Sequence, residues 1–206
     1  MAVNSFRRGL KLPTRKHATK GKPIEQIPAC KQVTIPINQN FGAPNKPIVN
    51  IGDKVIRGHK IADIASSGAM TVPVHASISG IVKKIEPRTL ANGTEGLCII
   101  IEAEASDGLT TESRQEDFMP PLDPFTCTRE EALFRIREAG ILGMGGAGFP
   151  SHVKLSPPPD KPIDLIIADG AECEPYLTTD KASVSSNPNL LVKGLEIVMK
   201  DRKSVV

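Results

Sequence analysis

Between residues 31 and 105, short apolar segments alternate with turns that contain glycine. Val33, Ile35 and Ile37 are separated by polar or proline residues, and this period of two is typical of a half-buried β-strand. The run 97–101 is continuously apolar, as in a strand that is buried on both faces. Because short strands at close spacing favour a small sandwich or barrel, we predict an all-β domain over residues 31–105.

The order of turns and strands in this domain resembles that of biotinyl and lipoyl carrier domains. The matching residues include Gly52, Gly58 and Ile61, and the match resumes at residues 79–82. Carrier domains place a modifiable lysine at the hairpin tip between these two halves, which falls near residues 69–71 here. Since the sequence has no lysine from position 61 to position 82, we predict a carrier scaffold without an attached group.

The segment after the β domain changes in composition and then becomes helix-like. Residues 106–127 contain a Pro-Pro pair and predict a linker. Over residues 128–139, Thr128 and Glu131 form the capping box of a predicted helix, and Gly140 is a typical C-terminal stop. We therefore predict that a second domain begins with this helix.

Four glycines lie within six residues, from Gly143 to Gly148. Glycine adopts positive φ at little cost and lets a ligand approach the backbone, so the free N–H groups of such a loop suit a phosphate or a planar ring. A mobile glycine linker is the alternative. Gly143, Gly145 and Gly148 formally match G-x-G-x-x-G, but that dinucleotide fingerprint requires a strand before it and a helix after it. A predicted helix precedes this loop and prolines follow it, so we do not predict a Rossmann site.

An apolar run at residues 163–168 predicts a strand, and the acidic turn 169–178 follows it. Carboxylates at the carboxyl end of a strand stand where ligands bind in open α/β sheets. A solvated acidic loop is the alternative. Farther on, the pattern predicts a helix over residues 187–200, with Leu191, Leu195 and Val198 on its apolar face.

The glycine loop, the predicted strand and the acidic turn, in this order, resemble the RnfC subunit of the Rnf (Rsx) ion-translocating electron transport complex. They resemble more distantly the flavin- and NADH-binding subunit of respiratory complex I. The resemblance implies an α+β chain, in which a barrel-sandwich hybrid domain at 31–105 is followed by the start of an α/β flavin- and NADH-binding domain at 128–206. Residues 1–30 are expected to be an irregular basic segment. The family protein is longer, so a fragment or a truncated gene product is expected.

The resemblance implies a non-covalent FMN site with NADH oxidised beside it, and it assigns no catalytic side chain. In this comparison Lys154 suits a phosphate or a reduced-flavin anion, and Glu172 suits a ribose hydroxyl or the nicotinamide amide. Met144 replaces an arginine of the complex I relative, and Asp169 stands where an asparagine is usual. The cofactor-binding residues that it implies are Gly143, Gly145, Gly146, Ala147, Gly148, Phe149, Lys154, Glu172, Cys173 and Glu174.

The implied function is electron input to a membrane complex that moves ions, with electrons passing between NADH, FMN and [4Fe–4S] clusters. The implied partners are NADH and the other subunits of the complex, at the cytoplasmic face of the inner membrane. Cys30, Cys98, Cys127 and Cys173 lack the spacing of cluster ligands, so we predict no metal site in this chain. No apolar run approaches the ~18 residues that span a bilayer.

Basic residues are concentrated between Arg7 and Lys22, although the net charge of the whole chain is only +3. Such a run is typical of a solvated tail, and docking on an acidic partner or an anionic leaflet is the alternative. With no Trp and a single Tyr, nucleic acid binding is not supported. Two other functions stay open: a carrier-like or assembly module that works through its β domain, and a soluble NADH-linked flavoprotein that shares the loop.

Overall fold

The computed structural model describes residues 13–25, 27, 28, 30–64, 70–104, 119–144, 146–158, 160, 163 and 165–200. The chain divides into two compact units, Pro28–Pro162 and the pair of segments Met1–Ile27 and Ile163–Val206. Among the described residues, the first unit holds two β-sheets, two α-helices and the glycine loop, whereas the second holds the acidic turn, a short 3₁₀ helix and two α-helices.

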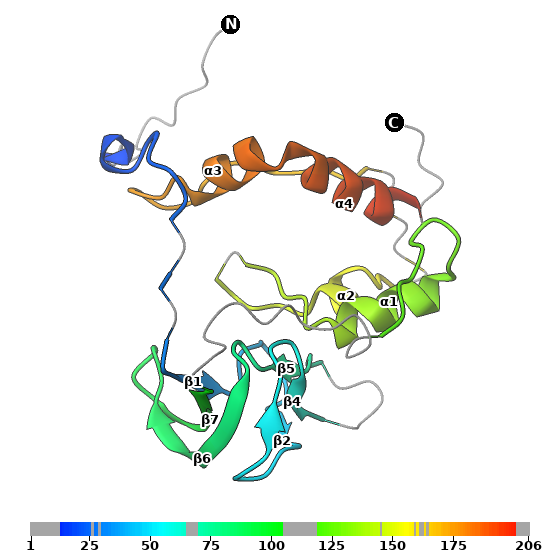
Figure 1. Ribbon diagram of the computed structural model, residues 1–206. Helices are drawn as coiled ribbons and strands as arrows, with labels where there is room; N and C mark the ends of the chain where they lie inside the picture. Colours follow the sequence, from blue (N-terminus) through cyan, green and yellow to red (C-terminus); the bar gives the residue numbers. More distant parts are fainter. Residues whose placement is uncertain are drawn as a thin grey trace, which may run out of the picture. The chain divides into compact units, whose positions relative to one another are not determined.

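The β domain consists of two antiparallel sheets (Figure 1). Their strands are β1 (Gln32–Pro36), β2 (Lys46–Pro47), β3 (Lys54–Val55), β4 (Lys60–Asp63), β5 (Val74–His75), β6 (Gly80–Thr89) and β7 (Glu95–Ala103). The larger sheet has the order β1-β7-β6-β3, and the smaller has the order β2-β4-β5. A register shift between Val82 and Lys84 interrupts the pairing of β6 with β7. The predicted all-β domain of short strands is confirmed.

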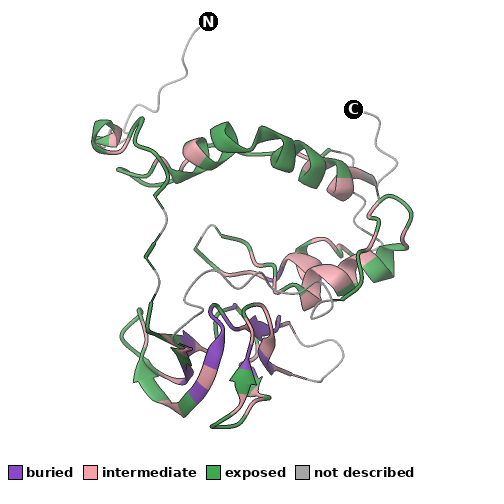
Figure 2. Ribbon diagram, in the orientation of Figure 1, coloured by how far each residue is buried: buried purple, intermediate pink, exposed green. Residues whose placement is uncertain are grey.

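Apolar side chains from both sheets form the core of the β domain. Ile61 of β4, Val82 of β6, and Ile99 and Ile101 of β7 are fully buried. Figure 2 shows that the buried residues are concentrated in the two sheets. Since burying one such side chain contributes about 1.5–3 kcal/mol, hydrophobic burial is the main stabilising interaction of this domain.

Helix α1 (Arg129–Glu138) begins where the sequence predicts. The N–H of Glu131 donates to Thr128 Oγ1 at 3.2 Å, and the N–H of Thr128 donates to Glu131 Oε2 at 2.8 Å. This reciprocal pair is the predicted capping box, and the hydrogen bonds from Thr128 lower the pKa of Glu131. A helix therefore leads into the glycine loop, as predicted, and the short helix α2 (Ser151–Lys154) follows the loop.

Four charged side chains, here called the charge cluster, join the C-terminal end of α1 to strand β4. Arg137 Nη2 lies 2.7 Å from Asp63 Oδ1, and Lys60 Nζ lies 3.0 Å from Asp63 Oδ2. Lys60 and Arg137 both pair with Glu138 as well. Burial opposes ionisation here, but the hydrogen bonds outweigh it, so they raise the pKa of Lys60 and lower the pKa of Asp63. The charge cluster thus fixes α1 on the β domain.

The second unit contains η1 (Lys16–Ala18), α3 (Thr179–Ser186) and α4 (Pro188–Lys200). Helix α4 confirms the helix predicted over 187–200, and it starts with a proline, whose fixed φ suits the first helical position. In the described part of the chain, no helix is both long enough and apolar enough to cross a membrane.

The strand predicted over residues 163–168 is wrong. Ile163 and residues 165–168 are irregular, and Asp164 lies outside the described residues. Leu165 and Ile167 are 72% and 76% exposed. A strand needs neighbours for its N–H and C=O groups, and none of the described strands pairs with this segment. The described residues of the apolar run therefore have no regular secondary structure.

Candidate functional site

Residues 141–151 form a loop that is closed at its base. Leu142 and Pro150 make an antiparallel bridge, and Pro150 is fully buried. The N–H of Gly143 donates to the carbonyl of Phe149 at 2.8 Å, and the N–H of Ser151 donates to the carbonyl of Ile141 at 3.1 Å. These contacts make residues 143–149 an anchored loop rather than a free linker.

Two glycines of the loop have positive φ for different reasons. Gly146 has φ +101°, and a Cβ built on it would meet nothing within 4 Å. Gly148 has φ +59°, and its Cβ would lie 3.0 Å from the carbonyl oxygen of Gln39. Gly146 therefore faces open space, whereas Gly148 allows close contact with the β domain. Gly145 lies outside the described residues.

The N–H groups of residues 146–148 make no hydrogen bond with any other residue that the structure describes. Gly146 and Ala147 are exposed, while Gly148 and Phe149 are half-buried. Unpaired N–H groups on an exposed glycine backbone can donate to a phosphate or to the polar edge of a ring. The loop thus has the donors and the space that the sequence predicts.

The loop also contacts the β domain. The N–H of Phe41 donates to the carbonyl of Gly148 at 3.0 Å. The rings of Phe41 and Phe149 lie 6.3 Å apart between centroids, with 23° between their planes. Sequence reasoning missed these contacts, because more than a hundred positions separate the two segments and neither carries a local signal of the other.

Two ionisable side chains follow the loop on α2. Lys154 is exposed, and no ion pair within the described segments involves it. His152 is half-buried, and burial followed by the nearby charge of Arg137 lowers its pKa. Its Nδ1 atom is buried and has no hydrogen-bond partner among the residues described. Burial and the neighbouring cation thus both favour the neutral form of the His152 imidazole.

Glu172 of the acidic turn is held by contacts within its own unit. Its Oε2 lies 2.9 Å from Lys16 Nζ, and its side chain is only 9% exposed. Its Oε1 accepts from the N–H groups of Asp180 and Lys181 at 2.9 Å and 3.2 Å, at the start of α3. The hydrogen bond from Lys16, together with the two N–H groups, lowers the pKa of Glu172. Both carboxylate oxygens therefore have partners inside the chain.

Residues 14–19, here called the basic clasp, form hydrogen bonds with the acidic turn. Tyr176 has φ +68°, and its N–H donates to the carbonyl of Thr14 at 2.8 Å. The hydroxyl of Thr19 donates to the carbonyl of Tyr176 at 2.6 Å, and Lys16 Nζ donates to the carbonyl of Leu177 at 3.0 Å. At least this part of the basic segment binds its own chain instead of acting as a solvated tail.

The remaining predicted residues of the turn are open to solvent. Cys173 and Glu174 are exposed. Asp169 accepts a hydrogen bond from the N–H of Ala171 at 2.8 Å and so stabilises the start of the turn. The glycine loop belongs to one unit and the acidic turn to the other. Their meeting in one pocket therefore stays a prediction.

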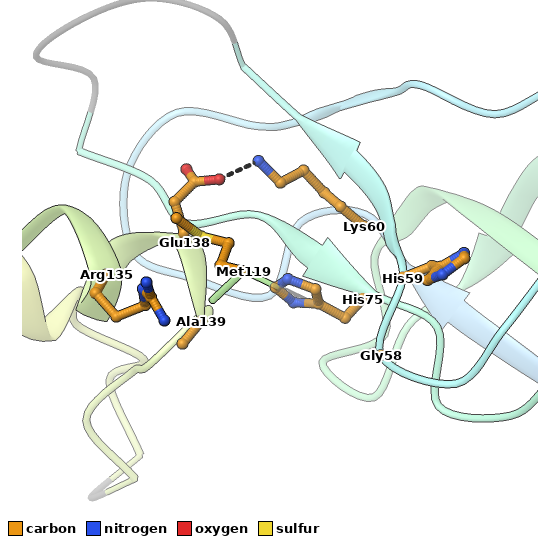
Figure 3. A pocket seen from close by; sticks show the side chains of 8 residues that line it. All are labelled: Gly58, His59, Lys60, His75, Met119, Arg135, Glu138 and Ala139. Atoms are coloured by element: carbon orange, nitrogen blue, oxygen red, sulfur yellow. Dashed lines mark hydrogen bonds and ion pairs between the residues drawn. The ribbon is translucent and has the colours of Figure 1, made fainter. Parts of the chain in front are cut away.

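A cavity of about 540 Å³ lies where α1 meets the β domain, and the sequence did not predict it. Figure 3 shows Lys60 reaching toward Glu138 beside the ring of His75. Burial is the main cause that lowers the pKa of His75. The cavity is lined by Gly58, His59, Lys60, His75, Met119, Arg135, Glu138 and Ala139.

The cysteines of the chain are free thiols. Cys98 is buried in β7, and this burial raises its pKa, whereas Cys30 and Cys173 are exposed. Across the described ranges, no three His, Cys, Asp or Glu side chains gather in a way that could hold a metal ion.

Two known families match different stretches of the chain. Residues 4–106 match the RnfC barrel sandwich hybrid domain, and residues 136–203 match the Nuo51 FMN-binding domain. The chain is thus a barrel-sandwich hybrid followed by flavin-binding sequence, which confirms the predicted α+β class. It belongs to the RnfC family.

Three of the similar curated proteins, each from a different bacterium, are subunits of oxidoreductase complexes. The chain is 41% identical over 202 residues to its relative in the proton-translocating ferredoxin:NAD(+) oxidoreductase complex of Clostridium ljungdahlii. It is 39% identical over 200 residues to its relative in the Na(+)-translocating ferredoxin:NAD(+) oxidoreductase complex of Acetobacterium woodii. It is 35% identical over 202 residues to its relative in an ion-translocating oxidoreductase complex of Pseudomonas aeruginosa. These matches cover 96%, 95% and 97% of the chain but only 42%, 43% and 25% of the relatives.

Proposed function

We propose that the chain is part of an electron-input subunit of a membrane-bound, ion-translocating oxidoreductase. In this role it binds FMN at the glycine loop and handles electrons that pass between NADH and iron–sulfur clusters. The observation that carries the proposal is the anchored loop of residues 143–149, which lies inside the match to an FMN-binding domain. The names of the three relatives support the wider role.

The residues of the loop fit a flavin nucleotide. The open space at Gly146 leaves room for a ligand against the backbone, and the N–H groups of residues 146–148 are available as donors. Lys154, exposed on α2, supplies a cation for a phosphate or for a reduced-flavin anion. When bound, FMN supplies the acceptor for a hydride and the donor of single electrons.

The acidic turn contributes to NADH binding in this proposal. The turn needs a fixed shape to orient a nicotinamide, and Glu172 provides it by joining Lys16 to the start of α3. Glu174 and Cys173 are exposed and therefore accessible to a ligand. Glu172 therefore positions the turn, while Glu174 offers the free carboxylate.

The proposed partners are the other subunits of the complex, at the cytoplasmic face of the inner membrane. The iron–sulfur clusters are proposed for parts of the family protein outside this chain. A carrier-like function is disfavoured, since residues 61–82 contain no lysine for an attached group. A soluble NADH-linked flavoprotein is the second alternative, and co-purification of the protein with membrane-embedded subunits would argue against it.

FMN reconstitution tests the proposal. The full-length protein is incubated with FMN under anaerobic conditions and desalted, and the flavin released on denaturation is measured by fluorescence. We expect stoichiometric FMN and bleaching of the flavin absorbance after addition of NADH. Protein that retains no flavin would overturn the proposed function.

A further inference from the structure

The loop of residues 38–45 in the β domain touches the second half of the glycine loop. Gln39 and Asn40 lie close to Gly148, and Phe41 contacts the glycine loop in two specific ways. The backbone N–H of Phe41 binds the carbonyl of Gly148 at 3.0 Å, and its ring lies nearly parallel to that of Phe149. Both contacts hold the two residues that directly follow the unpaired N–H groups of Gly146 and Ala147.

Buried polar side chains fix this loop on the β domain. The hydroxyl of Thr71 lies 3.1 Å from Asn40 Oδ1 and 3.2 Å from Asn45 Oδ1. The amide of Asn45 donates to the carbonyls of Ile37 and Val72 at 3.2 Å and 2.9 Å. Buried hydrogen-bond networks of this kind restrict a loop to one conformation. The backbone of Phe41 therefore has a defined position before any ligand binds.

A glycine next to Phe41 is required by the same packing. Gly42 has φ +131°, and a Cβ on it would lie 1.8 Å from the carbonyl oxygen of Met70. The loop is thus pressed against the segment that begins at Met70. The ring of Phe41, in contrast, is 59% exposed and takes no part in the hydrophobic core. Its position is determined by the fold, but its apolar surface contributes little to the stability of the β domain.

We propose that Phe41 is a positioning residue of the FMN site. It holds Gly148 and Phe149 so that the N–H groups of residues 146–148 point to the ligand. The barrel-sandwich hybrid domain is then a working part of the cofactor site rather than a scaffold alone. This inference rests on the proposed function and names a residue far outside the flavin-binding match at 136–203.

Flavin titration of full-length variants tests this role. Phe41→Ala removes the ring but keeps the N–H, and we expect FMN affinity to fall about threefold to tenfold, the range expected for one aromatic pair. Phe41→Tyr keeps the ring, and this variant should bind FMN as tightly as the unmodified protein does. Phe125→Ala is the matched control, because Phe125 is 52% exposed and should leave the affinity unchanged.

The thermal midpoint of the apo protein separates positioning from folding. Because the ring of Phe41 is exposed, Phe41→Ala should change the apo midpoint no more than Phe125→Ala does. Phe41→Leu, which keeps an apolar side chain without a ring, provides the test if alanine unfolds the loop.

Two results would overturn the inference in distinguishable ways. If the unmodified protein retains no FMN, the proposed function fails and the inference fails with it. If the unmodified protein retains FMN, but Phe41→Ala and Phe41→Leu bind it as tightly as Phe125→Ala, the proposed function stands and only the role of Phe41 is lost.

Discussion

The glycine loop and the acidic turn, the two halves of the predicted site, are held in shape by different means. The loop is closed by neighbours in sequence, through the bridge of Leu142 with Pro150 and the bond of Gly143 with Phe149. The turn is closed across the chain, because Lys16 pairs with Glu172, 156 positions away. The closure of the glycine loop thus has local determinants, to which Phe41 adds a distant contact, whereas the closure of the acidic turn itself depends on a distant segment.

The largest expected effect comes from filling the open space in the loop. Gly146→Val places a branched side chain where a ligand approaches the backbone, so we expect the full-length protein to lose most of its bound flavin. Flavin fluorescence after denaturation measures this loss. Gly52→Val is the matched control, because Gly52 has φ +97° and likewise no neighbour within 4 Å of a built Cβ. Full flavin occupancy in Gly146→Val would remove the loop from the site.

The next effect concerns the carboxylates of the turn. Glu172→Gln keeps the shape of the side chain but removes its charge, so we expect FMN to stay bound while hydride transfer from NADH slows by roughly tenfold, about 1.4 kcal/mol in the barrier. Stopped-flow bleaching of the flavin measures the rate. Glu174→Gln is the comparison, since Glu174 is exposed and its change leaves the contact with Lys16 intact. Unchanged bleaching in both variants would make the turn a solvated acidic loop.

A smaller effect is expected from the basic clasp, and it depends on pH. The pKa of Glu172 is lowered in the folded chain, so its stabilising contact is complete above the unfolded pKa of about 4.3 and is lost as pH falls through the folded value. Lys16→Met should raise the pKa of Glu172 in the folded chain, so the stabilising contact of Glu172 is then lost at a higher pH. The contact is followed by measuring the hydrogen-exchange protection of the Asp180 and Lys181 amides as a function of pH.

Lys20→Met is the control for the clasp, because Lys20 is an exposed lysine of the same basic segment. It should leave the exchange profile of the two amides where it is in the unmodified protein. Identical profiles for Lys16→Met and Lys20→Met would mean that the ion pair does not hold the turn.

The smallest effect tests the helix that leads into the glycine loop. Thr128→Ala removes the cap of α1 and should cost about 1 kcal/mol of unfolding free energy. Thr178→Ala is a matched change, since Thr178 precedes α3 but its side chain makes no capping hydrogen bond. Urea unfolding of both variants checks the difference. Equal midpoints would show that the capping box does not stabilise α1.

The sequence predicts well where the determinants of structure are close together. The capping box of α1, the alternating pattern of β1 and the start of α4 at a proline all lie within a few positions, and all three are confirmed. The strand predicted over 163–168 fails because apolar composition does not supply a hydrogen-bonding neighbour.

The candidate site is predictable only in part, for a related reason. The glycine pattern indicates an open backbone at Gly146, since positive φ and missing Cβ atoms are properties of single residues. The contact of Phe41 with Gly148 and the pairing of Lys16 with Glu172 join segments that fold together only through the tertiary structure. A propensity-based pattern contains no information about such pairs, because neither partner is unusual in its own neighbourhood.

The charge cluster between α1 and β4 has a further property that concerns long-range electrostatics. Two cations, Lys60 and Arg137, face two carboxylates, Asp63 and Glu138, within hydrogen-bond reach. Their shifted pKa values keep Lys60 protonated and Asp63 ionised at neutral pH, and the monopole of the four groups is zero. The charge cluster, which orients the glycine loop on the β domain, therefore contributes little to the electrostatic potential at a distance from the protein. In the proposed function, the phosphate of an incoming FMN is attracted by other charges, such as that of Lys154, and not by the contacts that hold the glycine loop in place.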